Sequence, residues 1–92
     1  PMLSFKSFDE VVERANNNDL GLCSYIYTNS MEKAHKASEL METGCVAVNT
    51  PTVAIAEAPF GGIKQTGYGR EGGSMAIKDY LNIKYTHLGL KT

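Results

Sequence analysis

The stretch GYGREG, residues 67–72, fits the pattern G-x-G-x-x-G. In dinucleotide-binding folds these glycines let the backbone approach a pyrophosphate at the start of a helix. That use also requires a strand leading into Gly67 and an acidic residue about 20 positions later, which binds a ribose. The preceding residues GGIKQT are a poor strand, and no Asp or Glu follows Asp79. The residue types therefore argue against a dinucleotide-binding loop at this place.

The same loop suggests two other kinds of phosphate or anion site. A phosphate loop needs Lys and then Ser or Thr directly after its second glycine, and Tyr68 and Gly69 follow Gly67 instead. A backbone nest that binds an anion beside Lys64 or Arg70 stays open as a hypothesis. The simpler alternative is that the glycines let the backbone turn sharply and approach another segment closely.

The cysteines and histidines show no spacing typical of a catalytic or metal site. Cys23 and Cys45 lie far apart in the sequence, each in an apolar run and without neighbouring His or Asp pairs. We predict that both are buried, reduced packing residues. His35 falls on the polar side of a predicted helix, and His87 has no carboxylate or cysteine nearby in sequence. We therefore expect no metal site in this chain.

The elements that would position these residues follow a β-α-β-α-β order. Segments rich in β-branched and aromatic residues alternate with segments of helical apolar periodicity. The predicted elements are a strand over Leu3–Phe5, a helix from Ser7 to residues 16–19, a strand over Leu22–Thr28, a helix from Asn29 and a strand over Cys45–Thr50. Short connections in this order predict a piece of a parallel-sheet α/β domain with right-handed crossovers.

Capping signals define the two predicted helices. Ser7 and Glu10 have the spacing of a capping box, and Asn29 and Glu32 repeat it. Gly44 stands where the glycine that ends a helix is expected. The predicted apolar face of the second helix consists of Met31, Ala34, Ala37, Leu40 and Met41.

From Pro51 onward the chain changes character. Six of its nine glycines lie between this residue and Ser74, which predicts a long ordered loop of the kind that is usually functional. Glu57 and Glu71 lie in this loop, whereas most other acidic residues belong to helix caps and solvated faces. A short helix with Ser74 as N-cap and a terminal strand, NIKYTHLGL, follow. That strand has no evident partner, so we expect it to pair across a subunit boundary.

Length and charge limit the class of protein. With 92 residues, 42% of them apolar, the chain is one globular unit or a piece of one, and it would be marginally stable alone. A net charge of −1 with scattered basic residues argues against nucleic acid and membrane surfaces as partners. No apolar run could span a bilayer and no signal-peptide pattern is present, so we expect a cytoplasmic protein. The start at Pro1 leads us to expect a segment of a longer chain.

The glycine loop as a whole resembles a longer signature. APFGGIKQTGYGREGG, residues 58–73, is similar to the C-terminal signature of the NAD(P)-dependent aldehyde dehydrogenase superfamily. The resemblance implies structural roles in the loop for Asn49, Pro59, Gly61, Gly62, Gly67, Gly69 and Arg70. It covers the whole chain, with residues 1–81 similar to the C-terminal part of the catalytic domain and 82–92 similar to the oligomerisation strand. Succinate-semialdehyde dehydrogenases and other dehydrogenases of small semialdehydes look most similar.

The resemblance implies an enzyme that oxidises an aldehyde irreversibly to a carboxylic acid with NAD or NADP. In the family, a cysteine thiolate attacks the carbonyl, hydride passes to the coenzyme, and a glutamate-activated water hydrolyses the thioester. These catalytic groups and the coenzyme domain lie upstream of this region in family members. We therefore expect no catalytic cysteine and no coenzyme-binding residue in this chain, which should be inactive alone while the rest of the protein binds NAD or NADP.

A few residues receive substrate-related roles through the resemblance. Phe60 is implied to line the aldehyde cleft, with core packing as an alternative that is compatible with it. Glu71 is implied to relay protons from the buried base towards solvent, and a structural ion pair or helix-cap partner is the open alternative. Ala54 and Ile55, beside Val53, are similar to the variable substrate entrance. Succinate-semialdehyde dehydrogenases tend to carry a serine near Ala54, and alanine cannot donate that hydrogen bond, so the substrate class stays wider.

The partners implied by the resemblance are a small aldehyde substrate, the rest of the dehydrogenase chain, and further copies of the protein in a dimer or tetramer. A second hypothesis of another class is a stand-alone small α/β binding or assembly module without catalytic activity. The two differ in what is encoded upstream of Pro1. A long coding stretch with a cysteine nucleophile motif supports the enzyme, and a start codon supports the module.

Overall fold

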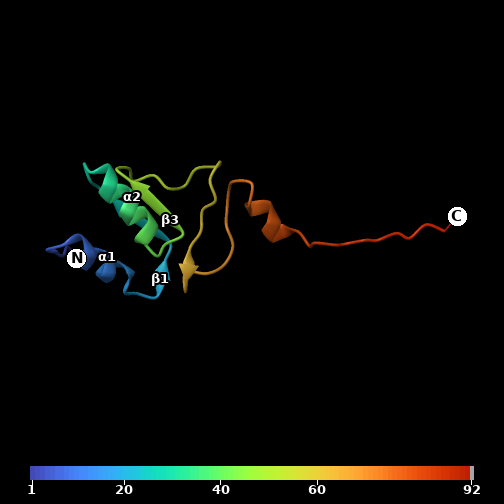
Figure 1. The fold of residues 1–92 in the computed structure, drawn as a ribbon, viewed down its shortest axis with the longest axis horizontal. Coiled ribbons are helices and arrows are strands. Elements are labelled where there is room, and N and C mark those ends of the chain that lie inside the picture. The colour runs from blue at the N-terminus through green and yellow to red at the C-terminus, as the bar shows by residue number, and fades with distance from the viewer. Residues whose placement is uncertain (92) are drawn as a thin grey trace.

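The computed structural model describes residues 1–91 as an elongated chain with extents of 74 × 25 × 22 Å. Figure 1 shows the helices α1 and α2 and the strands gathered at one end, with the C-terminal segment leading away from them. The elements in chain order are α1 (Phe8–Asn16), β1 (Leu20–Gly21), β2 (Cys23–Ile26), α2 (Met31–Leu40), β3 (Cys45–Val48), β4 (Ile63–Lys64) and the 3-10 helix η1 (Ala76–Tyr80).

Strands β2 and β3 pair in parallel, and α2 connects them. This confirms the β-α-β part of the expected order. The predicted first strand is wrong, because Leu3–Phe5 forms no strand in the described chain. Leu3 and Phe5 are 73% and 56% exposed, and an extended segment without a neighbour cannot pair its backbone groups. The parallel sheet of residues 1–91 therefore has two strands.

A short antiparallel pair of β1 and β4 was not expected from the sequence. Leu20 lies opposite Lys64, and Gly21 lies opposite Ile63. Lys64 has a positive φ of 57°, and neither glycine nor lysine is typical of a strand, so the residue pattern holds no signal for this pairing. It brings the glycine loop against the N-terminal half of the chain.

Helix α1 begins as its capping box predicts. The Ser7 hydroxyl accepts a hydrogen bond from the Glu10 amide at 3.1 Å. The Glu10 carboxylate accepts one from the Lys6 amide at 2.8 Å and pairs with Arg14 at 3.2 Å. The Lys6 amide above all, with a smaller contribution from Arg14, holds the pKa of the Glu10 carboxyl below its usual value.

Helix α2 begins and ends differently from its predicted bounds. Ser30 rather than Asn29 caps it, because the Ser30 hydroxyl accepts the hydrogen bond from the first turn at 3.2 Å. Both residues are good caps, so the sequence does not separate them. The helix ends at Leu40, so Gly44 is not its terminal glycine. Gly44 lies instead against the backbone of Gly61.

The described chain buries few apolar side chains. Ala34 and Ala37 of α2 and Ala47 of β3 are 6%, 5% and 4% exposed. The predicted apolar face of α2 is therefore right at its centre. It is wrong at its edges, since Met31 is 78% exposed and Leu40 is 44% exposed. The buried centre between helix and sheet therefore consists of small side chains, while large ones such as Met31 at the edge of α2 are exposed.

The C-terminal part contains no regular α-helix among the residues described, up to residue 91. The 3-10 helix η1 starts after Met75 without a side-chain cap, so the prediction of Ser74 as N-cap is wrong. Residues 81–91 are extended and have no strand partner within the described chain. The pairing of 82–92 across a subunit boundary stays a prediction, and Thr92 lies outside the described residues. No helix of residues 1–91 has the length and apolar character needed to cross a membrane.

Candidate functional site

The glycine loop folds back on itself so that Phe60 and Glu71 form an isolated antiparallel bridge, here called the loop bridge. Each amide donates to the other residue's carbonyl, at 2.6 Å from Phe60 and 2.7 Å from Glu71. Side chains of directly opposed residues project from the same face, with Cβ atoms about 5 Å apart. Phe60 is half-buried and Glu71 is exposed. The fold thus brings together the two residues to which the resemblance gives roles near the substrate.

Arg70 closes the base of this loop. Its Nη1 donates to the carbonyl oxygens of Gly62 at 2.9 Å and Gly69 at 2.8 Å. Its backbone amide donates to the Asp79 carboxylate at 3.0 Å. A rigid guanidinium that binds two carbonyls holds the two arms of the loop at a set separation. Arg70 is therefore a positioning group for the loop bridge.

Lys64 fastens the loop to the N-terminal half of the chain. Its Nζ donates to the carbonyl oxygens of Asn16 at 2.9 Å and Asn18 at 3.2 Å, and lies 2.6 Å from the Glu42 carboxylate. Asn16 ends α1, where carbonyls lack helical partners and a cation is favourable. Because both cations of the loop hold carbonyl oxygens, the geometry does not favour the anion-nest hypothesis.

The GYGREG segment does not fit a dinucleotide pyrophosphate. Gly67 and Gly69 have positive φ values of 120° and 85°, which only glycine adopts without strain. A Cβ on Gly69 would lie 2.8 Å from the Asp79 carboxylate, so a negative group already occupies the approach to this backbone. The helix that follows, η1, has five residues and no side-chain cap. The segment 67–72 and the short helix after it therefore do not fit the pyrophosphate of NAD or NADP.

The predicted substrate-entrance residues lie in a turn that rests on the glycine loop. The Gly73 amide donates to the Ala56 carbonyl at 2.8 Å. Ile55 lines a hollow of about 350 Å³ beside β3. Ala54 is exposed and lies outside this hollow, as does Phe60. Within the described chain, the structure anchors the entrance turn to the loop but does not join these residues in one cavity.

Asn49 ties the end of β3 to the end of β2. Its φ is 56°, a conformation that asparagine tolerates better than most residues. Its side-chain oxygen accepts from the Thr28 amide at 2.9 Å, and its side-chain nitrogen donates to the Thr28 carbonyl at 3.0 Å. A side chain with both a donor and an acceptor is required for this double contact. Asn49 thereby sets the direction in which the chain leaves β3 for the loop.

The cysteines and histidines are not part of the loop bridge and form no metal-binding cluster within residues 1–91. Cys23 and Cys45 are free thiols, half-buried rather than buried as predicted, because no further strand covers them within residues 1–91. His35 is exposed, as expected. The Nδ1 atom of His87 lies 3.0 Å from the Tyr85 hydroxyl, a polar partner that is neither a carboxylate nor a cysteine. No cluster of His, Cys, Asp and Glu that could hold a metal ion occurs in the part of the chain that the structure describes.

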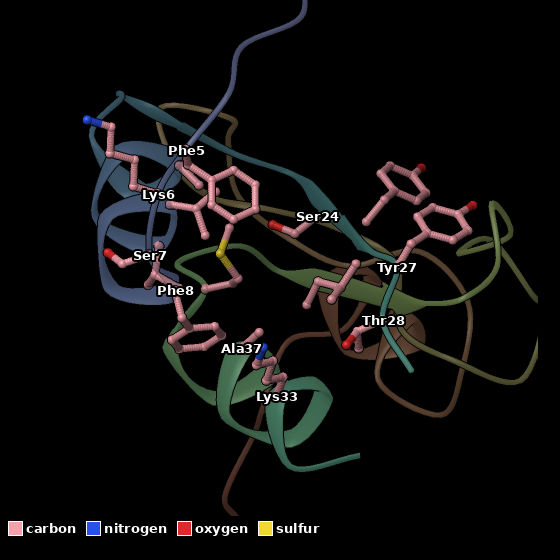
Figure 2. Close-up of a pocket in the computed structure, with 15 residues that line it drawn as sticks. Phe5, Lys6, Ser7, Phe8, Ser24, Tyr27, Thr28, Lys33 and Ala37 are labelled. Atoms are coloured by element: carbon pink, nitrogen blue, oxygen red, sulfur yellow. The ribbon is translucent and has the colours of Figure 1, made fainter. Parts of the chain in front are cut away.

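A cavity of about 520 Å³ lies between α1, β2 and α2 and away from the loop (Figure 2). Its walls include the aromatic rings of Phe5, Phe8 and Tyr27, with Ser24 and Thr28 among the polar groups. None of the predicted site residues lines it, and its lining contains no carboxylate or imidazole. The cavity is therefore separate from the candidate site.

Known proteins with similar sequences are aldehyde dehydrogenases. The aldehyde dehydrogenase family profile matches residues 1–86. A 3-sulfolactaldehyde dehydrogenase of Pseudomonas putida is 51% identical over 97% of this chain and 18% of its own length. An NADP(+) succinate-semialdehyde dehydrogenase of Escherichia coli is 41% identical over 98% of this chain and 19% of its own length. The chain thus spans about a fifth of the length of these relatives.

A solved structure gives the same result for the backbone. An aldehyde dehydrogenase from Bacillus cereus, in complex with NAD+, is 39% identical and matches with a TM-score of 0.91 over 97% of this chain and 18% of that one. The sequence match includes the loop bridge and the lysine that fastens the loop. On these grounds, the chain belongs to the aldehyde dehydrogenase family.

Proposed function

We propose that this chain is the C-terminal part of an enzyme that oxidises a small, acid-bearing semialdehyde to a carboxylic acid with NAD or NADP. The observation that carries the proposal is the family match over residues 1–86, which contains the complete loop. The names of two relatives specify 3-sulfolactaldehyde and succinate semialdehyde, aldehydes that carry an acid group. Residues 1–92 alone are inactive in this proposal, because the nucleophile and the coenzyme domain belong to the rest of the enzyme.

The exposed apolar surface supports a role as part of a larger unit. Phe5, Tyr25 and Ile55 are 56%, 50% and 52% exposed, while the buried apolar residues of the described chain are alanines. A domain that folds alone buries side chains of this size. We infer that the rest of the enzyme covers them and fills the cavity between α1, β2 and α2.

The loop bridge gives Phe60 and Glu71 adjoining tasks in this enzyme. Phe60 supplies an apolar wall beside the aldehyde, and Glu71 carries protons between the buried base and solvent. Two features support the relay: Glu71 is exposed, and its carboxylate has no ion-pair partner among residues 1–91. Ala54 offers no side-chain donor at the entrance, so the acid group of the substrate is bound by groups elsewhere in the enzyme.

The substrate class is tested by steady-state kinetics of the full-length protein. With NAD+ or NADP+, we expect kcat/KM for succinate semialdehyde or 3-sulfolactaldehyde to exceed that for a neutral aldehyde of similar length by about 100-fold or more. A neutral aldehyde leaves the polar groups that bind the acid without a partner. The measurement is the absorbance of the reduced coenzyme, and residues 1–92 alone should give no signal above the blank.

Equal kcat/KM values for the acid-bearing and neutral aldehydes would contradict the substrate class. Absence of coenzyme reduction with every aldehyde would contradict the proposed activity itself. Turnover by residues 1–92 alone would contradict the assignment of the nucleophile and the coenzyme site to the rest of the enzyme.

The relay is tested by the substitution Glu71→Gln in the full-length protein. We expect kcat to fall by roughly 10-fold or more, with KM nearly unchanged, because the amide cannot accept and release a proton. The alkaline and acid limbs of the kcat against pH profile should shift as well. Glu57→Gln, at an exposed carboxylate of the same loop outside the bridge, is the matched control. An unchanged kcat with faster thermal inactivation would instead favour a structural role.

A further inference from the structure

Cys23 and Cys45 form a side-by-side pair of thiols that the proposed function does not use. They lie directly opposite each other on the parallel strands β2 and β3. Neighbouring strands are about 4.8 Å apart, which falls within the range of Cα separations that a disulfide spans. Both thiols are free and half-buried in the described chain.

The two thiols also influence each other. Burial raises the pKa of the Cys23 thiol, and the neighbouring Cys45 thiol raises it further. Opposed residues of paired strands project from the same face of the sheet, which accounts for this interaction. This shift in the pKa agrees with the placement of the two sulfurs side by side on one face of the sheet.

This pair lies next to the candidate site. The Cys45 thiol donates to the Gly61 carbonyl at 3.6 Å, and Gly61 directly follows Phe60. Gly44, which precedes Cys45, packs against the backbone of the same glycine. A change in the bonding of the Cys45 sulfur therefore alters a contact with Gly61, the residue next to the loop bridge.

We propose that Cys23 and Cys45 are an oxidisable dithiol site, which a hydroperoxide converts into a disulfide between β2 and β3. One thiol gives up its proton and its sulfur attacks the peroxide; the O–O bond breaks, a sulfenic acid forms, and the leaving oxygen takes up the proton and departs as water or an alcohol. The second sulfur attacks the sulfenic sulfur, the S–S bond forms, and the sulfenic oxygen leaves as water. The thiols lose two electrons and two protons, and the peroxide gains them.

The disulfide has two structural consequences. Cβ atoms in a disulfide are about 3.8 Å apart, less than the about 4.8 Å between neighbouring strands, so the two side chains must lean towards each other at this pair. The Cys45 sulfur also loses the hydrogen that it donates to Gly61. A dithiol reverses the reaction by thiol–disulfide exchange, in which its thiolate attacks one sulfur of the disulfide.

The site is tested by peptide mapping of the full-length protein after treatment with hydrogen peroxide. Trypsin places Cys23 in peptide 15–33 and Cys45 in peptide 37–64, with lysines or arginines at their ends. We expect these peptides to appear joined by a disulfide after alkylation under denaturing conditions, and to separate after treatment with dithiothreitol. The alkylated fraction of both cysteines should fall together after peroxide and rise together after dithiothreitol.

Matched variants separate this reaction from other oxidation. In Cys23→Ser, the joined peptide should be lost and Cys45 should be alkylated or oxidised singly, and Cys45→Ser should behave reciprocally. Two thiols that stay fully alkylated, or that are oxidised independently to sulfinic acids in the wild-type protein, would overturn the proposal. Because the readout is a peptide map of the wild-type protein, it does not depend on dehydrogenase activity or on the folding of a variant.

Discussion

Replacing Gly44 by alanine is expected to destabilise the proposed enzyme by about 3 kcal/mol and to remove most of its activity. The Cβ of alanine would overlap the Gly61 carbonyl and lie 2.8 Å from the Gly62 Cα. These are backbone atoms, so no side-chain rotation relieves the contact. The start of β3 or the glycine loop must move, and the loop bridge moves with it. Gly44 is not one of the glycines with a positive φ. The expected loss therefore comes from the steric overlap and not from backbone strain.

Two other glycines serve as controls for this effect. Gly89→Ala should be nearly neutral, since no atom of the described chain lies within 4 Å of the added carbon and alanine is tolerated within a paired strand at least as well as glycine. Gly67→Ala also meets open space, but its φ of 120° should cost about 1–3 kcal/mol in backbone strain. Half-lives of thermal inactivation and kcat/KM measure the three variants, because a large enzyme seldom unfolds reversibly. Equal losses for Gly44→Ala and Gly89→Ala would contradict the close contact.

The helices and the parallel pair could be predicted from local residue patterns. The capping box at Ser7 depends on residues three positions apart, so it is visible in the sequence. The cap of α2 is not decided locally, because Asn29 and Ser30 are both good caps and the surrounding fold selects Ser30. The predicted strand at Leu3–Phe5 has the right residue types but lacks a partner in the described chain. Strand assignment depends on such partners, which a local pattern does not contain.

The sequence names candidate site residues through the resemblance but does not give their arrangement, and their roles stay predictions. The resemblance names Phe60 and Glu71, yet their direct pairing depends on contacts from Arg70 to carbonyls on both arms of the loop. The role of Gly44 was predicted as a helix end and is instead a close backbone contact. In each case, the deciding partner lies far away in sequence. Spacing rules describe neighbours within a few residues and carry no information about such partners.

Replacing Lys64 by methionine is expected to lower stability by about 2 kcal/mol and to loosen the end of α1. Methionine has a similar length but cannot donate to the Asn16 and Asn18 carbonyls, which lie 2.9 Å and 3.2 Å from the lysine nitrogen. The lysine side chain is 26% exposed, so water replaces these bonds only in part. Hydrogen exchange of the amides near the end of α1 and thermal inactivation of the full-length protein measure the change.

The ion pair of Lys64 with Glu42 should contribute much less than these carbonyl contacts. The Glu42 side chain is 54% exposed, and ion pairs at such sites are typically worth about 0–1 kcal/mol. Glu42→Gln should therefore leave both measurements near wild type, whereas Lys64→Met should not. In the double variant the loss should nearly equal that of Lys64→Met alone. If Glu42→Gln instead reproduces the full loss, the lysine acts through its charge pair, and its attachment to the helix end is secondary.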